Sequence, residues 1–133
     1  MKILIVDDST HVLKQLPKAL ERFFPEAEID TAWSYVEADK LLKENIYEVI
    51  LLDGELSEHI TDPWQHAFGY YLIEPIRNSS SSKATIIMIS TDEQMRNQGE
   101  ELGANFKISK NEFFGGGKVI NSLTRNFTVE DGL

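Results

Sequence analysis

The sequence predicts an α/β fold in which a parallel sheet carries helices on both faces. Short, continuous apolar runs alternate along the chain with longer stretches in which apolar residues recur at helical spacing. Strands buried on both faces have such runs, and repeated strand–helix units build a parallel sheet with right-handed crossovers. Five of these units can be counted, so we expect a doubly wound sheet of five strands.

Four of the predicted strands are apolar runs, and the second in chain order is a more polar segment between two helical patterns. A run of four to eight residues bounded by polar or turn residues is typical of a strand. The five predicted strands are residues 3–6, 28–32, 49–52, 86–89 and 106–109.

Helical spacing predicts a helix after each strand, over residues 10–24, 34–44, 69–77, 93–102 and 119–127. Ser9 or Thr10 suits the N-cap of the first helix, and Gly103 suits the position after the end of the fourth. Pro17 lies inside the first helix, where a proline costs about 3 kcal/mol. We therefore expect that helix to kink or to begin later than Thr10.

Two segments between the elements are predicted as loops. Residues 54–68 form an irregular polar stretch, longer than the usual connection of about two to six residues, and long loops beside a strand's carboxyl end are often functional. The serine run 79–82 is interpreted as a solvated loop. Four aromatic residues follow or lie within the long loop, and they suit a small satellite core or a partner contact: Trp64, Phe68, Tyr70 and Tyr71.

Composition excludes several classes of function. With 133 residues, the chain has room for one domain with a real core but not for a second catalytic or DNA-binding domain. Its formal charge of −9 and the lack of a basic block argue against direct nucleic-acid binding. There is no cysteine, and the first apolar run is too short for a signal peptide or membrane span. We therefore expect a cytoplasmic protein with no membrane partner.

Residues that can handle phosphate follow four of the predicted strands. Asp7 and Asp8 come after the first strand, Asp53 after the third, Ser90 after the fourth and Lys110 after the fifth. The carboxyl ends of parallel strands meet at one edge of a sheet, so these side chains are expected to converge. Three carboxylates, a hydroxyl and an ammonium suit the Mg²⁺-assisted transfer of a phosphoryl group onto a carboxylate.

These spaced parts resemble the receiver (REC) domains of two-component response regulators over nearly the whole chain. The resemblance implies a flavodoxin-like sheet in the order 2-1-3-4-5. It also implies a receiver domain over residues 1–127, a C-terminal tail over residues 128–133, and a single-domain protein that acts in trans. The matching motifs are Ile5-Val6-Asp7-Asp8-Ser9, Ile50-Leu51-Leu52-Asp53, Met88-Ile89-Ser90 and Gly103-Ala104 followed by Lys110.

A Mg²⁺ ion is the cofactor that this resemblance implies. Mg²⁺ prefers six oxygen ligands and keeps several waters. We expect Asp8 and Asp53 to bind it directly and Asp7 to bind it partly through water. By its position in the family pattern, the backbone carbonyl of Glu55 is a further ligand.

The resemblance also assigns the catalytic residues. Asp53 accepts the phosphoryl group, Ser90 donates a hydrogen bond to that group, and Lys110 neutralises charge on its oxygens. The donor is a phosphohistidine on a sensor histidine kinase or phosphotransfer protein, and the signal passes to a downstream protein target. The chain thus catalyses only its own phosphorylation and dephosphorylation within a phosphorelay and is not a metabolic enzyme.

Two other functions stay open. The first is a degenerate receiver that docks partners without phosphorylation. It is motivated by Lys107, where the family usually has an aromatic residue, by Thr91, by Asn111 after the lysine, and by the long loop inserted after Asp53. The second is a small hydrolase with an aspartyl-phosphate intermediate. That reading needs a second aspartate where Glu55 stands, and a cap domain.

Overall fold

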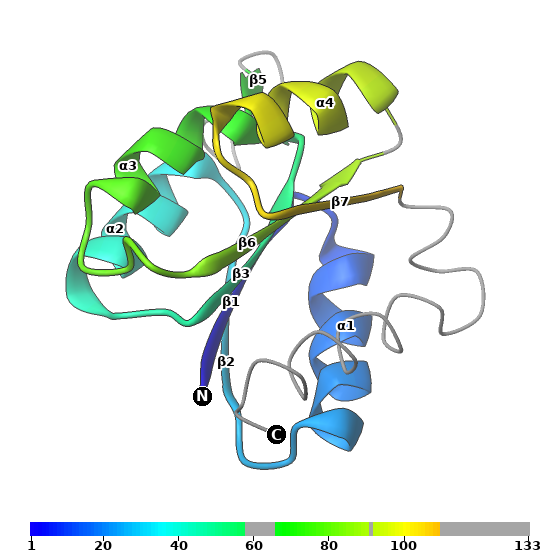
Figure 1. Cartoon of the computed structure of the whole chain (residues 1–133). Coiled ribbons are helices and arrows are strands. Elements are labelled where there is room, and N and C mark those ends of the chain that lie inside the picture. The colour runs from blue at the N-terminus through cyan, green and yellow to red at the C-terminus, as the bar shows by residue number, and fades with distance from the viewer. Residues whose placement is uncertain (58–65, 91, 110–133) are drawn as a thin grey trace.

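The five-stranded parallel sheet is confirmed in the computed structural model (Figure 1). The structure describes residues 1–57, 66–90 and 92–109, with only the backbone described at residues 23, 55–57 and 66–70. The strand order is β2-β1-β3-β6-β7, which is 2-1-3-4-5 when the strands of this sheet are counted along the chain. The strands are β1 (Lys2–Val6), β2 (Glu28–Ala32), β3 (Val49–Asp53), β6 (Thr85–Ser90) and β7 (Phe106–Ser109).

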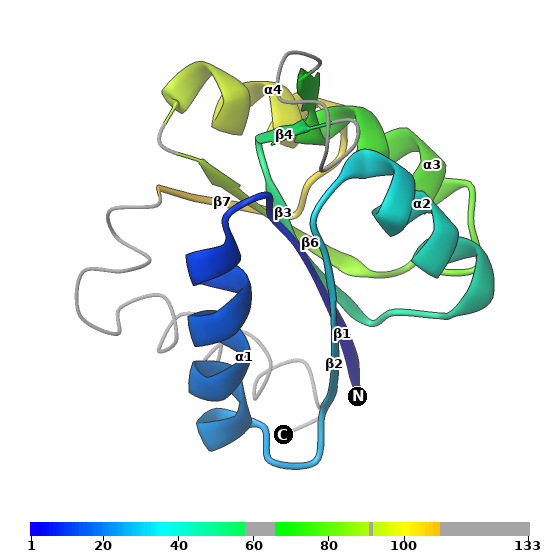
Figure 2. The same cartoon turned by 180° about the vertical axis from the view of Figure 1, so that it is seen from behind.

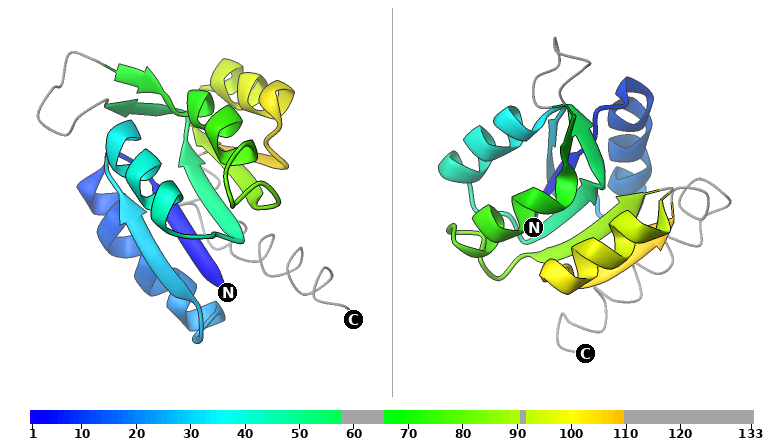
Figure 3. Two further views of the ribbon diagram at one scale, coloured as in Figure 1. Left: turned by 90° about the vertical axis from the view of Figure 1, so that its left-hand side faces the viewer. Right: turned by 90° about the horizontal axis from the view of Figure 1, so that it is seen from above.

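Helices cover both faces of this sheet (Figures 1 and 2). The view from above in Figure 3 shows the strands between α1 on one side and α2 on the other. Only α1 (Thr10–Phe23) packs on the first face among the described helices. The other face carries α2 (Tyr35–Glu44), the 3₁₀ helix η1 (Gly69–Leu72) with α3 (Ile73–Arg77), and α4 (Glu93–Leu102). None of the described helices has the length and apolar composition needed to cross a bilayer.

Side chains of the central strands alternate between two cores, which explains why the strands read as continuous apolar runs. One core lies against α1 and the other against α2 and α3. The α1 side includes Ile3, Ile5, Val49, Leu51, Ile87 and Ile89, and the opposite side includes Leu4, Val6, Ile50, Leu52, Ile86 and Met88.

Helix α1 begins at Thr10, so the expectation that Pro17 delays its start is wrong. Ser9 is the N-cap, and its Oγ accepts a hydrogen bond of 3.3 Å from the Val12 backbone N–H. Burial of Val12 and the leucines that follow at helical spacing offsets the backbone hydrogen bond that Pro17 cannot donate. The N-cap at Ser9 is confirmed.

The sequence predicts an irregular stretch over residues 54–68, and the structure differs from this prediction. The two ends of this segment pair as an antiparallel ribbon of β4 (Glu55–Ser57) and β5 (His66–Phe68), which projects away from the main sheet (Figure 3, left). Residues 58–65 lie outside the described residues, as do the predicted helix 119–127 and the domain boundary at residue 127. Of the four aromatic residues near this segment, Tyr71 is exposed at 57%, so it does not belong to a satellite core.

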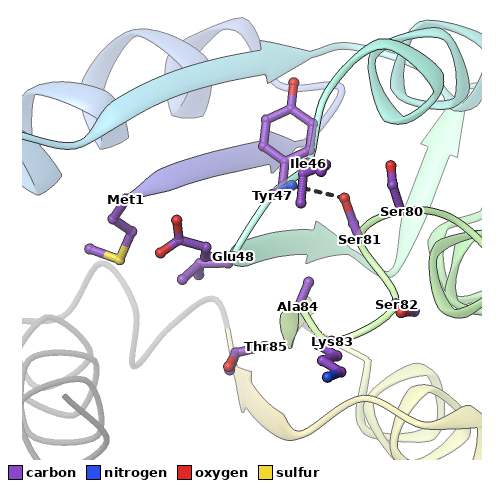
Figure 4. Close-up of a pocket in the computed structure, with 11 residues that line it drawn as sticks. Met1, Ile46, Tyr47, Glu48, Ser80, Ser81, Ser82, Lys83, Ala84 and Thr85 are labelled. Carbon is purple, nitrogen blue, oxygen red and sulfur yellow. Dashed lines mark hydrogen bonds between the residues drawn. The ribbon is translucent and has the colours of Figure 1, made fainter. Parts of the chain in front are cut away.

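The amino edge, by which we mean the edge formed by the first residues of the parallel strands, holds a network of polar contacts. Ser81 is buried, and its Oγ accepts a hydrogen bond of 2.8 Å from the Tyr47 backbone N–H (Figure 4). A buried N–H must have such a partner. The interpretation of residues 79–82 as a solvated loop is therefore wrong for Ser81. The Tyr47 hydroxyl in turn donates to Asp30 at 2.7 Å.

Arg77 joins two loops at the amino edge. Its Nη1 donates to the carbonyls of Ser82 and Ala84, and its Nη2 donates to the Gly103 carbonyl and to Asn105 Oδ1, over 2.7 to 3.0 Å. The loop before β6 and the loop before β7 are thus held by one guanidinium group. Gly103 ends α4 with a φ of 118°, which confirms its prediction as a helix-terminating glycine.

Candidate functional site

Three carboxylates meet at the carboxyl edge, the edge formed by the last residues of the parallel strands. Asp7 and Asp8 follow β1, Asp53 ends β3, and these strands are neighbours in the sheet. One carboxylate oxygen from each of the three residues lies within 4.8 Å of the others. Asp7 and Asp53 are about 95% buried, whereas Asp8 is exposed. The predicted convergence of these three side chains is therefore observed.

Local backbone contacts fix Asp7 at the start of α1. Its backbone N–H donates to the Ala32 carbonyl at 3.1 Å, which ties it to the end of β2. Its Oδ1 accepts a hydrogen bond of 2.8 Å from the Ser9 N–H, and Ser9 caps α1. A carboxylate beside a helix N-terminus is stabilised by the helix dipole. The cap of α1 thus also orients one member of the acidic trio, by which we mean Asp7, Asp8 and Asp53.

The trio suits a hard divalent cation. Mg²⁺ and Ca²⁺ both prefer oxygen ligands, and carboxylates supply oxygen with the negative charge that balances the ion. Three like charges at this spacing repel one another. Burial of Asp7 and Asp53 strengthens this repulsion, because little solvent is present to screen their charges. The donor set therefore fits the Mg²⁺ site expected from the sequence, and it fits Ca²⁺ as well.

Ser90 lies next to the end of β3. Gly54 donates its N–H to the Ile89 carbonyl at 3.0 Å, and a Cβ placed on Gly54 would lie 3.0 Å from both Cβ and Oγ of Ser90. A side chain at position 54 would therefore displace the serine. This close approach gives Gly54 a steric role, and it keeps the buried Ser90 hydroxyl beside the residue that follows Asp53.

The Ser90 hydroxyl is engaged by the first turns of α4. Its Oγ accepts a hydrogen bond of 3.1 Å from the Asp92 N–H and lies 3.8 Å from Met95 Sδ, to which it donates. The Ser90 carbonyl accepts a hydrogen bond of 2.7 Å from Arg96 Nη1. Sequence reasoning missed Met95 and Arg96, because nothing in the spacing of a polar helix shows which side chains reach back to a strand.

Other predicted site residues are described only in part. Lys110, Thr91 and Asn111 lie outside the described residues, and Glu55 is described only as backbone at the start of β4. Lys107 is exposed on β7, and its Nζ lies 2.9 Å from Asn97 Oδ1 and 3.2 Å from Glu100 Oε1 of α4.

A pocket of about 510 Å³ at the amino edge contrasts with this site (Figure 4). Glu48 is the one carboxylate among its lining residues, and the serines 80–82 and Lys83 supply most of its polar side chains. It has no cluster of acids that could hold a cation. Among the described residues, the group of acids that could hold a metal ion is therefore the one at the carboxyl edge.

Comparison with known proteins agrees with this picture. The family model described as the response regulator receiver domain matches residues 3–114, which is most of the chain. No curated protein matches the sequence at a significant level.

Solved structures share the fold at low sequence identity. A signal receiver domain of a DNA-binding response regulator from Colwellia psychrerythraea has a TM-score of 0.74 at 21% identity, with 98% of each chain covered. A receiver domain protein from Methanospirillum hungatei has a TM-score of 0.72 at 21% identity, with 97% of each chain covered. A response regulator from Burkholderia pseudomallei, whose structure holds a phosphorylated aspartic acid and a calcium ion, has a TM-score of 0.71 at 20% identity. The match covers 98% of this chain and 72% of that one.

Proposed function

Because the chain belongs to the family of response regulator receiver domains, we propose that Asp53 accepts a phosphoryl group from a phosphohistidine donor in a Mg²⁺-dependent reaction. The observation that carries this proposal is the acidic trio, whose oxygens lie within 4.8 Å of one another at the end of β1 and β3. The phosphorylated aspartic acid in the Burkholderia pseudomallei structure supports it by analogy.

The metal would be held by Asp8 and Asp53, with Asp7 acting partly through water and the Glu55 carbonyl as a further ligand. When bound, Mg²⁺ neutralises negative charge on the phosphoryl oxygens. Asp7 stays in place because the Ser9 N–H and the Ala32 carbonyl hold it. Its role is to complete the charge of the site rather than to react.

In the transfer, a carboxylate oxygen of Asp53 attacks phosphorus. The new P–O bond forms as the P–N bond to the donor imidazole breaks, and the imidazole leaves with the electron pair of that bond and takes up a proton. The Ser90 hydroxyl then donates a hydrogen bond to a phosphoryl oxygen, and Lys110 pairs with the group. Hydrolysis of the acyl phosphate by water returns Asp53 to its starting state.

The partners of the proposed reaction are proteins. A sensor histidine kinase or phosphotransfer protein supplies the phosphoryl group, and a downstream target reads the phosphorylated surface. The net charge of −9 disfavours a nucleic-acid target. We propose residues 1–127 as the receiver domain and the cytoplasm as its compartment, where such donors are found.

Beryllium fluoride and a small phosphodonor, each with Mg²⁺, test the proposal. We expect a mass increase of one phosphoryl group with the donor, and chemical-shift changes at Ser90 and α4 with beryllium fluoride. Both should be lost in Asp53→Asn and kept in Asp39→Asn, a matched change on α2. If neither reagent acts on the unsubstituted protein, the proposal is wrong and the docking-only alternative takes its place. Shifts without a mass increase would show that the site is competent and needs a protein donor.

A further inference from the structure

Residues at the start of α4 contact both the hydroxyl and the backbone carbonyl of Ser90. The Asp92 N–H and Met95 Sδ engage the hydroxyl, while the Arg96 guanidinium donates to the carbonyl at 2.7 Å. A hydrogen bond from a charged donor at this distance is among the stronger ones in proteins. The serine is thus held from the α4 side through both its side chain and its backbone.

Two glycines allow the strand ends and α4 to pack closely beside Ser90. Gly54 lies against the serine, where a Cβ would come within 3.0 Å of it and within 3.1 Å of Met95 Cβ. Gly99 lies so close to β6 that a Cβ there would fall 2.6 Å from Met88 Cε. The end of β3, the end of β6 and α4 are therefore closely packed beside Ser90.

A second contact holds the other half of α4. Lys107 Nζ lies 2.9 Å from Asn97 Oδ1 and 3.2 Å from Glu100 Oε1, which ties β7 to the helix. The lysine and glutamate side chains are 39% and 51% exposed, so this ion pair is weaker than the partly buried Arg96 contact. Arg96 is therefore the main polar tie between α4 and the site.

We infer that Arg96 is a positioning residue, which holds Ser90 in the state where its hydroxyl contacts α4 rather than a phosphoryl group. The inference rests on the proposed function. To reach a group on Asp53, the Ser90 hydroxyl must give up its bond to Met95, and the strand end that Arg96 holds must move with it. Ligand affinity is reduced by whatever free energy favours the held state. Arg96 thus sets how readily the site accepts its ligand.

The test is a titration of the full chain with beryllium fluoride at saturating Mg²⁺. We expect Arg96→Gln to bind about three to ten times more tightly than the unsubstituted protein, the factor that the typical net contribution of one hydrogen bond supports. Arg96→Lys, which keeps the charge but not the planar fork, should fall in between. Lys107→Gln should change the affinity by about twofold or less. Arg22→Gln, at the exposed end of α1, is the matched control and should bind like the unsubstituted protein.

If Arg96 only stabilised the fold, the result would be different. Arg96→Gln would then melt at a lower temperature while its affinity for beryllium fluoride stayed within 1.5-fold of the unsubstituted value, on the order of experimental error. That result, or weaker binding, would overturn the inference and leave the proposed function in place. If the unsubstituted protein shows no binding that depends on Asp53, both the proposed function and this role of Arg96 are wrong.

Discussion

The two edges of the central sheet use polar groups in opposite ways. At the amino edge, Ser81 pairs with the Tyr47 N–H, Tyr47 pairs with Asp30, and Arg77 meets four oxygen acceptors. At the carboxyl edge, three groups of the same charge lie within 4.8 Å of one another. The first arrangement lowers the free energy of the folded chain, whereas the like charges of the second repel one another and suit a divalent cation.

This difference separates stability from activity within one sheet. Polar groups that donate and accept in matched pairs need no further partner, and their removal is expected to cost stability and nothing else. Carboxylates that lie close together repel one another, and binding of a cation would relieve that repulsion. Substitutions at the two edges should therefore change stability with opposite signs, which can be measured.

Arg77→Met should have the largest effect. Loss of the guanidinium leaves up to four acceptors to be satisfied by water, and we expect the free energy of unfolding to fall by about 2 to 3 kcal/mol. Urea unfolding of this variant beside Arg22→Met measures the effect, and the control should stay within about 0.5 kcal/mol. A loss equal to that of the control would show that water replaces Arg77 without cost. Affinity for Mg²⁺ should be unchanged.

Ser81→Ala should cost about 1 to 2 kcal/mol, because it leaves the buried Tyr47 N–H without its acceptor. Ser80→Ala is a matched control in the adjacent position, where the side chain is exposed. Thermal or urea unfolding of the two variants distinguishes the effect of losing this hydrogen bond from the effect of replacing any serine of the run. Equal stability of the two variants would contradict the role assigned to Ser81.

Asp53→Asn should increase the free energy of unfolding, whereas the two substitutions above decrease it. Removing one of three like charges is expected to raise the metal-free stability by about 1 kcal/mol. With excess Mg²⁺ the unsubstituted protein should be the more stable of the two. It gains stability from binding Mg²⁺, whereas the variant has largely lost that binding. Unfolding curves with chelator and with Mg²⁺ give both values. A variant that is less stable in chelator would show that the trio is not strained.

Tyr47→Phe should have the smallest effect, about 0.5 kcal/mol near neutral pH, since the partly exposed Asp30 can turn to water. Burial, and then the hydrogen bond and charge of Asp30, raise the pKa of Tyr47 above its ordinary value of 10.0. A raised pKa means that this contribution is present below pH 10 and is lost as the pH rises further. The difference between the two proteins should therefore shrink in alkaline unfolding experiments. A constant difference would contradict this origin.

Much of the fold was predictable, because the features that determine it are local. Apolar runs mark strands buried on both faces, and Ser9, Ser34 and Asp92 cap their helices as their residue types favour. The convergence of the acidic trio followed from the geometry of parallel strands alone. In a parallel sheet, residues that follow different strands lie at the same end of the sheet, so their positions in the sequence predict that they meet.

The missed features depend on contacts between distant segments. Arg77 and Arg96 bond mainly to backbone carbonyls, which every residue has, so no residue type marks their partners. Ser81 is buried because Tyr47 needs an acceptor, although its neighbours are typical of an exposed loop. Pro17 does not delay the start of α1, because the packing of the helix on the sheet offsets the local cost of the proline.

The polar network of the amino edge has a consequence for how the strands align during folding. Strands that are apolar on both faces carry no alternation to distinguish the correct register from a slipped one. The Asn105 side chain, by contrast, accepts from the Ile86 N–H and from Arg77 in one alignment of β6 and β7. A slip by one residue would break both bonds and leave the N–H of the buried Ile86 without its acceptor. The same contacts that stabilise the native sheet thus also select it against its misaligned competitors.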